Sequence, residues 1–306
     1  MNYPVLALII ANIIWGLSPP IFKLALQDVP PFTLALIRFV GAALIFLPAA
    51  IVTWRKLSFG DFFLVCLTGF LGMVVNITFF FFGLKHGPSI NASIIGTAGP
   101  VVLFLMAVLF LHERPNKKVF SGMLLALFGV LVIVISPTVI DGDKRFVGEN
   151  VLISNLFYVV AVFGSVLAPV VAKKVLNRVN EYQFIFINFV FASICFSFGA
   201  FFELKNWSLN YIDARGQLGI IFGIFFASAI AYFLFFWATK RIAAQEIGVF
   251  AYIDPIASLL LAIPLLGEYP TSNYLLGAAL VLGGIFVAEG RLHWHPIHRL
   301  KIKNGE

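Results

Sequence analysis

Two charged residues, Asp254 and Arg38, lie in stretches that otherwise consist almost entirely of apolar side chains. Asp254 occurs in IGVFAYIDPIASLLLAIPLL and Arg38 in PFTLALIRFV. A charge in the hydrocarbon of a bilayer costs at least roughly 2.5 kcal/mol, so such residues are rare and often functional. Asp254 would carry a proton or contact the amino group of a substrate. In the alternative interpretation, its carboxyl satisfies the backbone group that Pro255 leaves without a partner.

Arg38 also allows two interpretations. Its guanidinium would attract a substrate carboxylate or pair with an acidic side chain. Alternatively, its long stem would carry the charged group to the outer interface of the membrane, as arginine stems can do near the end of a spanning helix. Both interpretations stay open at this point.

Several polar and aromatic residues lie three or four positions apart and therefore share a helix face. These pairs are Asn12 and Trp15, Asn76 and Phe80, Asn155 and Tyr158, and Ser228 and Tyr232. Together with Thr97 and Tyr252 they would line an aromatic, mostly uncharged cavity. Such a lining suits apolar or aromatic amino acids and, through the ring faces, organic cations. Alternatively, the polar members connect neighbouring helices by hydrogen bonds.

Two prolines are candidates for hinges. Pro100 and Pro255 lie near the middle of apolar stretches, where a proline removes one backbone hydrogen bond and bends a helix. Gly96 and Gly99 precede Pro100 and are expected to allow close approach of another backbone. Asp254 occupies the position of Gly99 in the second stretch.

Each of these prolines is followed by a glutamate thirteen residues later, Glu113 in one stretch and Glu268 in the other. A negative charge at the C-terminus of a helix is unfavourable to the helix dipole. We therefore expect each carboxylate to have a Lys or Arg partner in a neighbouring loop, and we interpret both as gating or structural residues.

The elements that carry these residues are predicted to be membrane-spanning helices. The chain is 61% hydrophobic and only 11% charged, which leaves too little polar surface for a water-soluble protein of this length. Apolar stretches of about 20 residues recur, each long enough to cross a bilayer, and only helices or closed barrels do so. The sequence predicts an all-α integral membrane protein with ten spans, at roughly 4–24, 32–54, 60–83, 90–111, 117–136, 150–172, 182–203, 216–238, 245–266 and 272–290.

The basic residues predict the orientation of these spans. The even-numbered loops and the C-terminal tail hold fourteen Lys and Arg residues, and the odd-numbered loops hold six. Cytoplasmic loops are enriched in these residues, so both termini are expected in the cytoplasm, with the protein in the cell membrane. The net charge of +7 is explained by this bias, and we expect no nucleic-acid partner.

The two halves of the chain repeat one another. An offset of 155 superposes Pro100 on Pro255 and Glu113 on Glu268, and an offset of 150 superposes Lys23 on Lys173. Each half would hold five spans, an odd number, so the second half would enter the membrane from the opposite side. This is an inverted-topology repeat, which places a substrate site near the midplane. The predicted parts are 1–145, 146–292 and a cytoplasmic basic tail, 293–306.

Three motifs resemble a known family. The first span contains WGLSPPIFK, the second LALIRF, and the fourth NASII followed by a proline and then by LHER. They resemble the EamA-type branch of the drug/metabolite transporter superfamily, whose members export or exchange amino acids, other metabolites and some toxic cations. The resemblance implies ten spans, often an acidic residue at the place of Asp254, and a peripheral helix for Arg38, which favours its interfacial position.

These features predict a secondary transporter that exports or exchanges small metabolites by alternating access, driven by protons or by a counter-substrate. The alternatives are a non-transporting receptor or assembly subunit and an intramembrane enzyme. The sequence has no G-x-S-x-G or H-E-x-x-H motif, no phosphate-binding loop and no histidine inside a predicted span, so no catalytic residue, metal ligand or cofactor is predicted. Substrate, direction and oligomeric state are not determined by the sequence.

Overall fold

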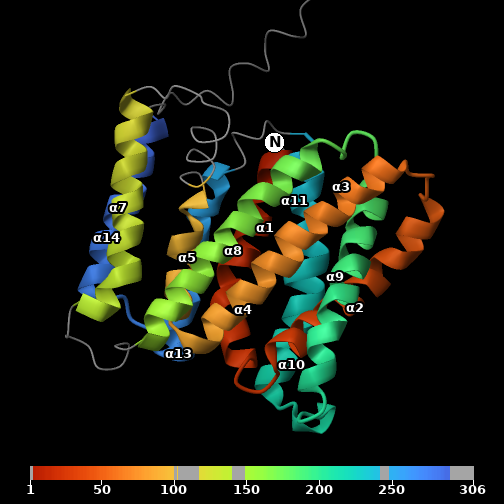
Figure 1. The fold of residues 1–306 in the computed structure, drawn as a ribbon, viewed down its shortest axis with the longest axis horizontal. Coiled ribbons are helices and arrows are strands. Elements are labelled where there is room, and N and C mark those ends of the chain that lie inside the picture. The colour runs from red at the N-terminus through yellow and green to blue at the C-terminus, as the bar shows by residue number, and fades with distance from the viewer. Residues whose placement is uncertain (1–2, 100–101, 103–116, 140–148, 242–247, 290–306) are drawn as a thin grey trace, which may run out of the picture.

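The computed structural model describes residues 3–99, 102, 117–139, 149–241 and 248–289, and these residues form helices joined by turns and short loops, with no strand among them (Figure 1). Six helical segments are long and apolar enough to cross a membrane. They are α1 (Tyr3–Ala25), α2 (Pro31–Val52), the run of α3, η1 and α4 (Phe59–His86), α8 (Glu149–Lys173), α9 (Glu181–Glu203), and the run of α10, η3 and α11 (Ala214–Thr239). The structure agrees with the predicted α-helical membrane protein.

The short 3₁₀ helix η2 (Leu209–Tyr211) lies in the connection between α9 and α10, and the other described helices fall on the remaining predicted spans. They are α5 (Ser89–Gly96), α7 (Lys117–Val139), the 3₁₀ helix η4 (Gly248–Ile253) with α13 (Asp254–Leu266), and α14 (Ser272–Glu289). The short helix α5 covers only the beginning of the predicted span 90–111, because most of that span lies outside the described residues. Pro100 and Glu113 lie outside them as well.

Local sequence signals define where several helices begin. Pro31 occupies the first turn of α2, where its missing N–H would have no helical partner in any case. Asn180 accepts a hydrogen bond from the backbone N–H of Tyr182 and thereby caps α9. Asp213 caps α10 in the same way through Arg215 and Gly216. Such caps satisfy backbone donors that a helix start leaves unpaired.

One helix start is capped by a residue from the other half of the chain. The carboxylate of Glu203, at the end of α9, accepts hydrogen bonds from the backbone N–H groups of Phe32 (3.1 Å) and Thr33 (2.7 Å) and from the Thr33 hydroxyl (2.9 Å). The carboxylate therefore lies at the positive end of the α2 dipole, which stabilises both groups. This contact fixes the end of α9 against the start of α2.

The helices are arranged in pairs. At the left of Figure 1, α7 and α14 lie side by side, and α2 packs against α9 at the opposite edge. The α7–α14 contact is close because of glycine: a Cβ on Gly129 would lie 2.6 Å from the carbonyl oxygen of Gly277, and a Cβ on Gly284 would collide with the backbone of Ala126. Small residues allow such close helix packing in membranes.

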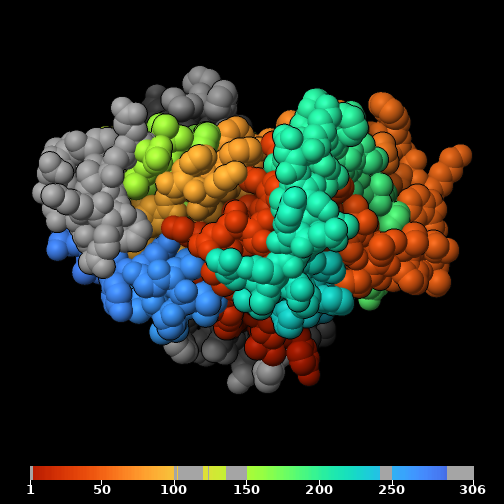
Figure 2. Space-filling model, turned by 90° about the horizontal axis from the view of Figure 1, so that it is seen from below, coloured from red at the N-terminus to blue at the C-terminus, as the bar shows by residue number. Residues whose placement is uncertain are grey.

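The connection between α9 and α10 covers one end of the bundle. Seen from below in Figure 2, this segment (teal) lies beside the α1–α2 connection (red), and α13 and α14 (blue) lie to the other side. Asp28 joins the first two segments, because its carbonyl accepts from Trp207 Nε1 at 2.9 Å and its carboxylate accepts from the Asp213 N–H at 2.7 Å.

The outward faces of the helices carry large exposed apolar side chains. Examples are Leu44, Val52, Phe198, Leu260 and Phe286, each more than half exposed. A soluble monomer rarely exposes such large contiguous apolar surface, whereas a bilayer covers it. The surface therefore agrees with the composition.

Candidate functional site

The candidate site lies where α1 meets α13. Asp254 is the first residue of α13 and directly follows the 3₁₀ helix η4. Pro255 therefore begins an α-helix and does not bend one, which corrects the expectation of a kink within a continuous helix. A proline is well tolerated there because the first N–H groups of a helix have no partner in the preceding turn. The change of helix type places a break in this span.

Gly16 brings α1 into direct contact with this break. A Cβ on Gly16 would lie 2.7 Å from the Ala257 Cβ and 2.8 Å from both the Cα and the carbonyl oxygen of Asp254. Only glycine fits so close to another backbone. The contact sets Asp254 against α1, with Trp15 next to Gly16 and Asn12 one turn earlier on the same face as Gly16.

One oxygen of the Asp254 carboxyl group lacks a hydrogen-bond partner among the described residues. The residue is partly exposed, but its Oδ1 atom is buried and receives no hydrogen bond in the part of the chain that the structure describes. The hydroxyl of Ser258, one turn further along α13, is also buried without a partner there. The N-terminus of α13 favours a negative charge, yet a buried carboxyl without a donor or cation is costly. Such a group can bind a proton or a cationic group.

Arg38 points into the bundle. It is only 2% exposed, its Nε donates to the Ser228 hydroxyl at 2.6 Å, and its Nη2 donates to the carbonyl oxygen of Ala227 at 3.2 Å. The expectation that its stem reaches the outer interface is wrong. The hydrogen bonds of Ser228 and Ala227 and the surrounding aromatic rings hold the guanidinium inside.

Trp15, Ser228 and Tyr232 form one group with Arg38. The indole Nε1 of Trp15 donates to the same Ala227 carbonyl at 3.1 Å, and the rings of Trp15 and Tyr232 meet edge to face at a centroid distance of 5.2 Å. The hydroxyl of Tyr232 donates to the Gly72 carbonyl at 3.3 Å. The structure thus brings together Trp15 of the first predicted span with Ser228 and Tyr232 of the eighth.

The other predicted polar residues mostly connect helices. Asn155 accepts from Asn91 Nδ2 at 2.9 Å and donates to the Ile133 carbonyl at 3.1 Å, and Tyr158 donates to the Pro88 carbonyl at 3.1 Å. Asn76 donates to the Ala161 carbonyl at 2.9 Å. These side chains fit the alternative in which polar groups hold helices together.

The remaining predicted residues differ in their surroundings. Phe80 is half-buried and lies 6.5 Å from the Tyr158 ring, and Thr97 is buried and donates to the Ile94 carbonyl at 2.6 Å. Asn12 is buried and donates to the Leu8 carbonyl of its own helix at 2.8 Å. Tyr252 is half-buried in η4. We keep these four residues as candidates for the pathway.

The two glycines before Pro100 play different roles. A Cβ on Gly99 would lie 3.1 Å from Val166 Cγ2, so this position is closely packed. A Cβ on Gly96 would meet none of the described residues within 4 Å. The expectation of close backbone approach is therefore wrong for Gly96, which is the last residue of α5.

Glu268 lies at one end of the contact between α1 and α13. It is 2% exposed and follows Gly267, whose φ of 65° turns the chain at the end of α13. One carboxylate oxygen accepts from Lys23 Nζ at 2.5 Å, and the other accepts from the Ser89 N–H at 2.8 Å and the Ser89 hydroxyl at 2.6 Å. The expected basic partner is present for Glu268, in the last turn of α1.

The contact between Glu268 and the start of α5 has no counterpart among the sequence-based expectations. The carboxylate also accepts from the Ile90 N–H at 3.2 Å, so it lies at the positive end of the α5 dipole. Pro88 followed by Ser89 is a helix-start signal, and it indicates where α5 begins. That Glu268 supplies the cap could not be inferred from this signal.

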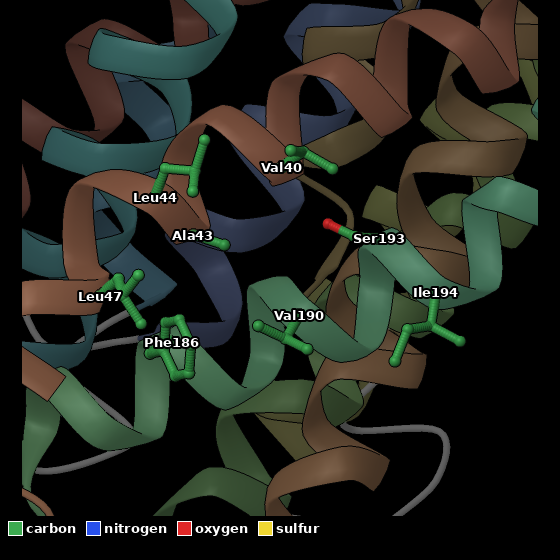
Figure 3. A pocket seen from close by; sticks show the side chains of 8 residues that line it. All are labelled: Val40, Ala43, Leu44, Leu47, Phe186, Val190, Ser193 and Ile194. Carbon is green, nitrogen blue, oxygen red and sulfur yellow. The ribbon is translucent and has the colours of Figure 1, made fainter. Parts of the chain in front are cut away.

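An apolar groove lies elsewhere, on the outer surface between α2 and α9. Figure 3 shows the eight residues that line it, among them Val40 and Leu44 of α2 and Phe186 and Ile194 of α9. Its one polar side chain, Ser193, donates to the Phe189 carbonyl at 2.8 Å. None of the predicted site residues lines this groove, and its apolar walls are suited to contact with lipid.

Comparison with known proteins relates the chain to transporters. The model of the EamA-like transporter family matches residues 2–135 and again residues 152–289. A "Probable amino-acid metabolite efflux pump" of Escherichia coli (strain K12) is 25% identical over 308 residues, covering 95% of each chain. The "Uncharacterized transporter YetK" of Bacillus subtilis (strain 168) is 22% identical over 280 residues, covering 90% of this chain and 84% of that protein.

A solved crystal structure has a similar fold. It superposes with a TM-score of 0.63 at 20% sequence identity, over 93% of this chain and 95% of that one. At this identity the likeness concerns the fold alone.

Proposed function

The chain belongs to the EamA-like transporter family, and on this basis we propose that it is a secondary transporter that exports or exchanges small metabolites by alternating access. Ten helices would form two inverted five-helix repeats, 1–145 and 146–292, with a basic tail at 293–306 and both termini in the cytoplasm. Two matches to the family model, at 2–135 and 152–289, support the division into repeats. The excess of Lys and Arg in the even-numbered loops supports the orientation.

The observation that carries the proposed mechanism is the Asp254 carboxyl at the break between η4 and α13, whose buried Oδ1 has no hydrogen-bond partner among the residues that the structure describes. Broken helices near the midplane are typical binding elements of transporters. Asp254 contacts an ammonium group of the substrate or carries the coupling proton. A counter-substrate that exchanges at the same carboxyl is the second form of coupling.

The aromatic group beside this site defines the substrate class. Trp15 and Tyr232 present rings from α1 and α11 within 5.2 Å of each other, and ring faces bind apolar bodies and organic cations. The substrates are therefore small amphipathic compounds with an amino or quaternary ammonium group, including aromatic and apolar amino acids. The relative named as an amino-acid metabolite efflux pump supports this class and the outward direction.

The Lys23–Glu268 pair acts as a gate in this mechanism. Glu268 joins α13 to α1 through Lys23 and to α5 through Ser89. Helices α1 and α13 meet at Asp254, and α5 leads to the predicted hinge at Pro100. Separation of the ion pair frees α13 to move away from α1 at this end, while the contact at Gly16 holds the helices together further inside.

Counterflow in proteoliposomes tests the proposal. The purified protein is reconstituted with amino acids, nucleosides, sugars or quaternary amines inside, and uptake of the labelled compound is measured with and without a pH gradient. We expect saturable counterflow for an aromatic or apolar amino acid or for a quaternary amine. Liposomes without protein are the control. Absence of saturable flux for every compound would contradict transport, and flux of sugars alone would contradict the role of Asp254.

A further inference from the structure

Two π-helical segments interrupt the spans that lie at equivalent positions in the two halves. They are η1 (Phe70–Val75) and η3 (Phe222–Ile230). The offset of 155 superposes Phe70 on Phe225 and Val75 on Ile230, so η1 falls within the equivalent of η3. π-Helical turns are rare and frequently mark functional sites. Their recurrence at the same place in each half indicates that they belong to the working parts of the molecule.

The carbonyl oxygens of two equivalent residues in these segments accept side-chain hydrogen bonds. Gly72 and Ala227 superpose at the same offset. Gly72 accepts from the Tyr232 hydroxyl, and Ala227 accepts from both Trp15 Nε1 and Arg38 Nη2. A carbonyl oxygen has two lone pairs, so Ala227 can accept both of these side-chain bonds.

Arg38 makes two hydrogen bonds with η3 and packs between aromatic rings. Its Nε donates to Ser228 and its Nη2 to Ala227, and its guanidinium carbon lies 5.0 Å from the ring centroids of Phe22 and Phe39. The planar guanidinium holds both acceptors in one fixed geometry, which an ammonium group cannot do. Gly223 leaves room for this packing, because a Cβ there would lie 3.3 Å from the Arg38 Cγ.

The charge of Arg38 has no carboxylate partner among the described residues, where every ion pair involves other side chains. Its repeat counterpart Asn188 is neutral and donates to the Phe184 carbonyl of its own helix at 2.7 Å. In the part of the chain that the structure describes, the η3 segment has a buried cation against it, and the equivalent position at η1 has the neutral Asn188. Such a charge is costly in a membrane, which argues that it performs a task that a neutral side chain cannot.

We infer that Arg38 is a positioning residue that fixes η3 against α2 and thereby holds the rings of Trp15 and Tyr232 in the substrate pathway. Trp15 shares the Ala227 acceptor with Arg38, and Tyr232 follows Ser228 by one helical turn. The guanidinium lies 6.0 Å from the Tyr232 ring centroid. Arg38 thus acts through the aromatic pair, and its effect on transport rests on the proposed function.

The fluorescence of Trp15 tests this inference without any substrate. In a variant that keeps only this tryptophan, with Trp54, Trp207, Trp237 and Trp294 replaced by Phe, acrylamide quenching reports how firmly the indole is held. We expect Arg38→Lys, which keeps the charge, and Ser228→Ala, which removes one acceptor, each to increase the quenching and shift the emission. The control Asn188→Ala changes the equivalent position of the other half and should leave both signals unchanged. Folded Arg38→Lys and Ser228→Ala proteins that retain the parental signal would overturn the inference.

Transport measurements separate this inference from the proposed function. For a compound that the wild-type protein moves, Arg38→Lys should lower the maximal counterflow rate by about tenfold, while Asn188→Ala leaves it near the wild-type value. A wild-type rate in Arg38→Lys would overturn the role in transport. If the wild-type protein moves no compound of the panel but Trp15 responds to Arg38→Lys, the proposed function fails and the positioning of Trp15 by Arg38 stands.

Discussion

Lys23 Nζ lies 2.5 Å from Glu268 Oε1, although the two residues are 245 positions apart in the chain. The pair differs from an exposed salt bridge, because the Glu268 side chain is only 3% exposed and the Lys23 side chain is 23% exposed. Exposed pairs contribute little to stability. In a buried pair, loss of one partner leaves an uncompensated charge, so this contact should matter both for folding and for the closed state of this end.

Glu268→Gln is expected to destabilise the protein by about 1–3 kcal/mol, because Lys23 and the start of α5 lose a charged acceptor. It should also change the counterflow rate, since α13 is no longer held to α1 at this end. Thermal unfolding in detergent and proteoliposome counterflow measure the two effects.

The matched control for this variant is Glu203→Gln. Glu203 also caps a helix from another segment, through the N–H groups of Phe32 and Thr33, but within the described ranges it forms no ion pair with an ammonium group. It should lose similar stability and keep the wild-type counterflow rate. Equal transport effects in both variants would show that Glu268 acts only as a cap.

Asp254→Asn is expected to reduce counterflow by at least about tenfold, because the amide can neither form a charge-assisted hydrogen bond with a substrate ammonium group nor bind the coupling proton. The variant should remain monodisperse, since the amide has nearly the same shape and the buried Oδ1 atom has no partner in the described ranges to lose. Counterflow with and without a pH gradient measures this effect. Wild-type uptake with an unchanged response to pH would remove Asp254 from the mechanism.

Asp213→Asn is the control for loss of a carboxylate. Asp213 lies in the loop before α10, where the hydrogen bond from Arg215 lowers its pKa to about 2. It is therefore ionised throughout the neutral range. Its replacement should leave both the counterflow rate and the pH response unchanged.

Gly16→Ala should destabilise the protein by about 1–3 kcal/mol, because overpacking forces neighbouring groups apart. The added methyl group would lie 2.8 Å from the Asp254 Cα, so it should also reduce counterflow. Gly60→Ala is the control, since a Cβ there meets nothing within 4 Å. Thermal unfolding and counterflow compare the two. A Gly16→Ala protein with wild-type stability would contradict the close contact of α1 with α13.

Gly284→Val should separate α14 from α7, because its Cβ would collide with the Ala126 and Gly122 backbones. We expect a lower midpoint of thermal unfolding and more aggregation in size-exclusion chromatography. The neighbouring Gly283→Val is the control, since its Cβ would meet nothing within 4 Å. Similar destabilisation by both variants would indicate a general effect of valine in this helix.

The proposed orientation predicts which loops an impermeant maleimide reaches in intact cells. In a background with Cys66→Ala and Cys195→Ala, cysteine at Ser208 should react from outside, because it lies in an odd-numbered loop. Cysteine at Asn177, in an even-numbered loop, should react only after permeabilisation. Both positions are exposed. The reversed pattern would place the termini outside, and equal reaction of both would contradict the assignment of these loops to opposite sides.

The local sequence predicts the position of Asp254 in its span better than it predicts the helix geometry at Pro255. The apolar surroundings of Asp254 marked it as a candidate, and it lies at the break in its span. Pro255 was expected to bend a helix, but the preceding segment is a 3₁₀ helix, so the proline begins α13. Helix type before a proline depends on the packing of neighbouring helices, and the local sequence does not contain that information.

The local sequence likewise does not determine where the Arg38 guanidinium lies. Its long stem permits both an interfacial and a buried guanidinium, and the choice depends on acceptors that are 189 and 190 residues away. Asn155 and Tyr158 shared a helix face as predicted, yet their bonds to other helices make them connectors.

Composition, helix length and short motifs are local properties, and they are enough to predict the class of the protein, the location of its apolar helices and its family. Which helices meet, and which polar groups lack a hydrogen-bond partner, depends on how the chain folds. Inside a membrane all helices are similarly apolar, so their association depends on close packing at small residues and on interhelical hydrogen bonds. The contacts of Gly16 with Asp254, of Glu268 with Lys23 and Ser89, and of Arg38 with η3 all arise in this way.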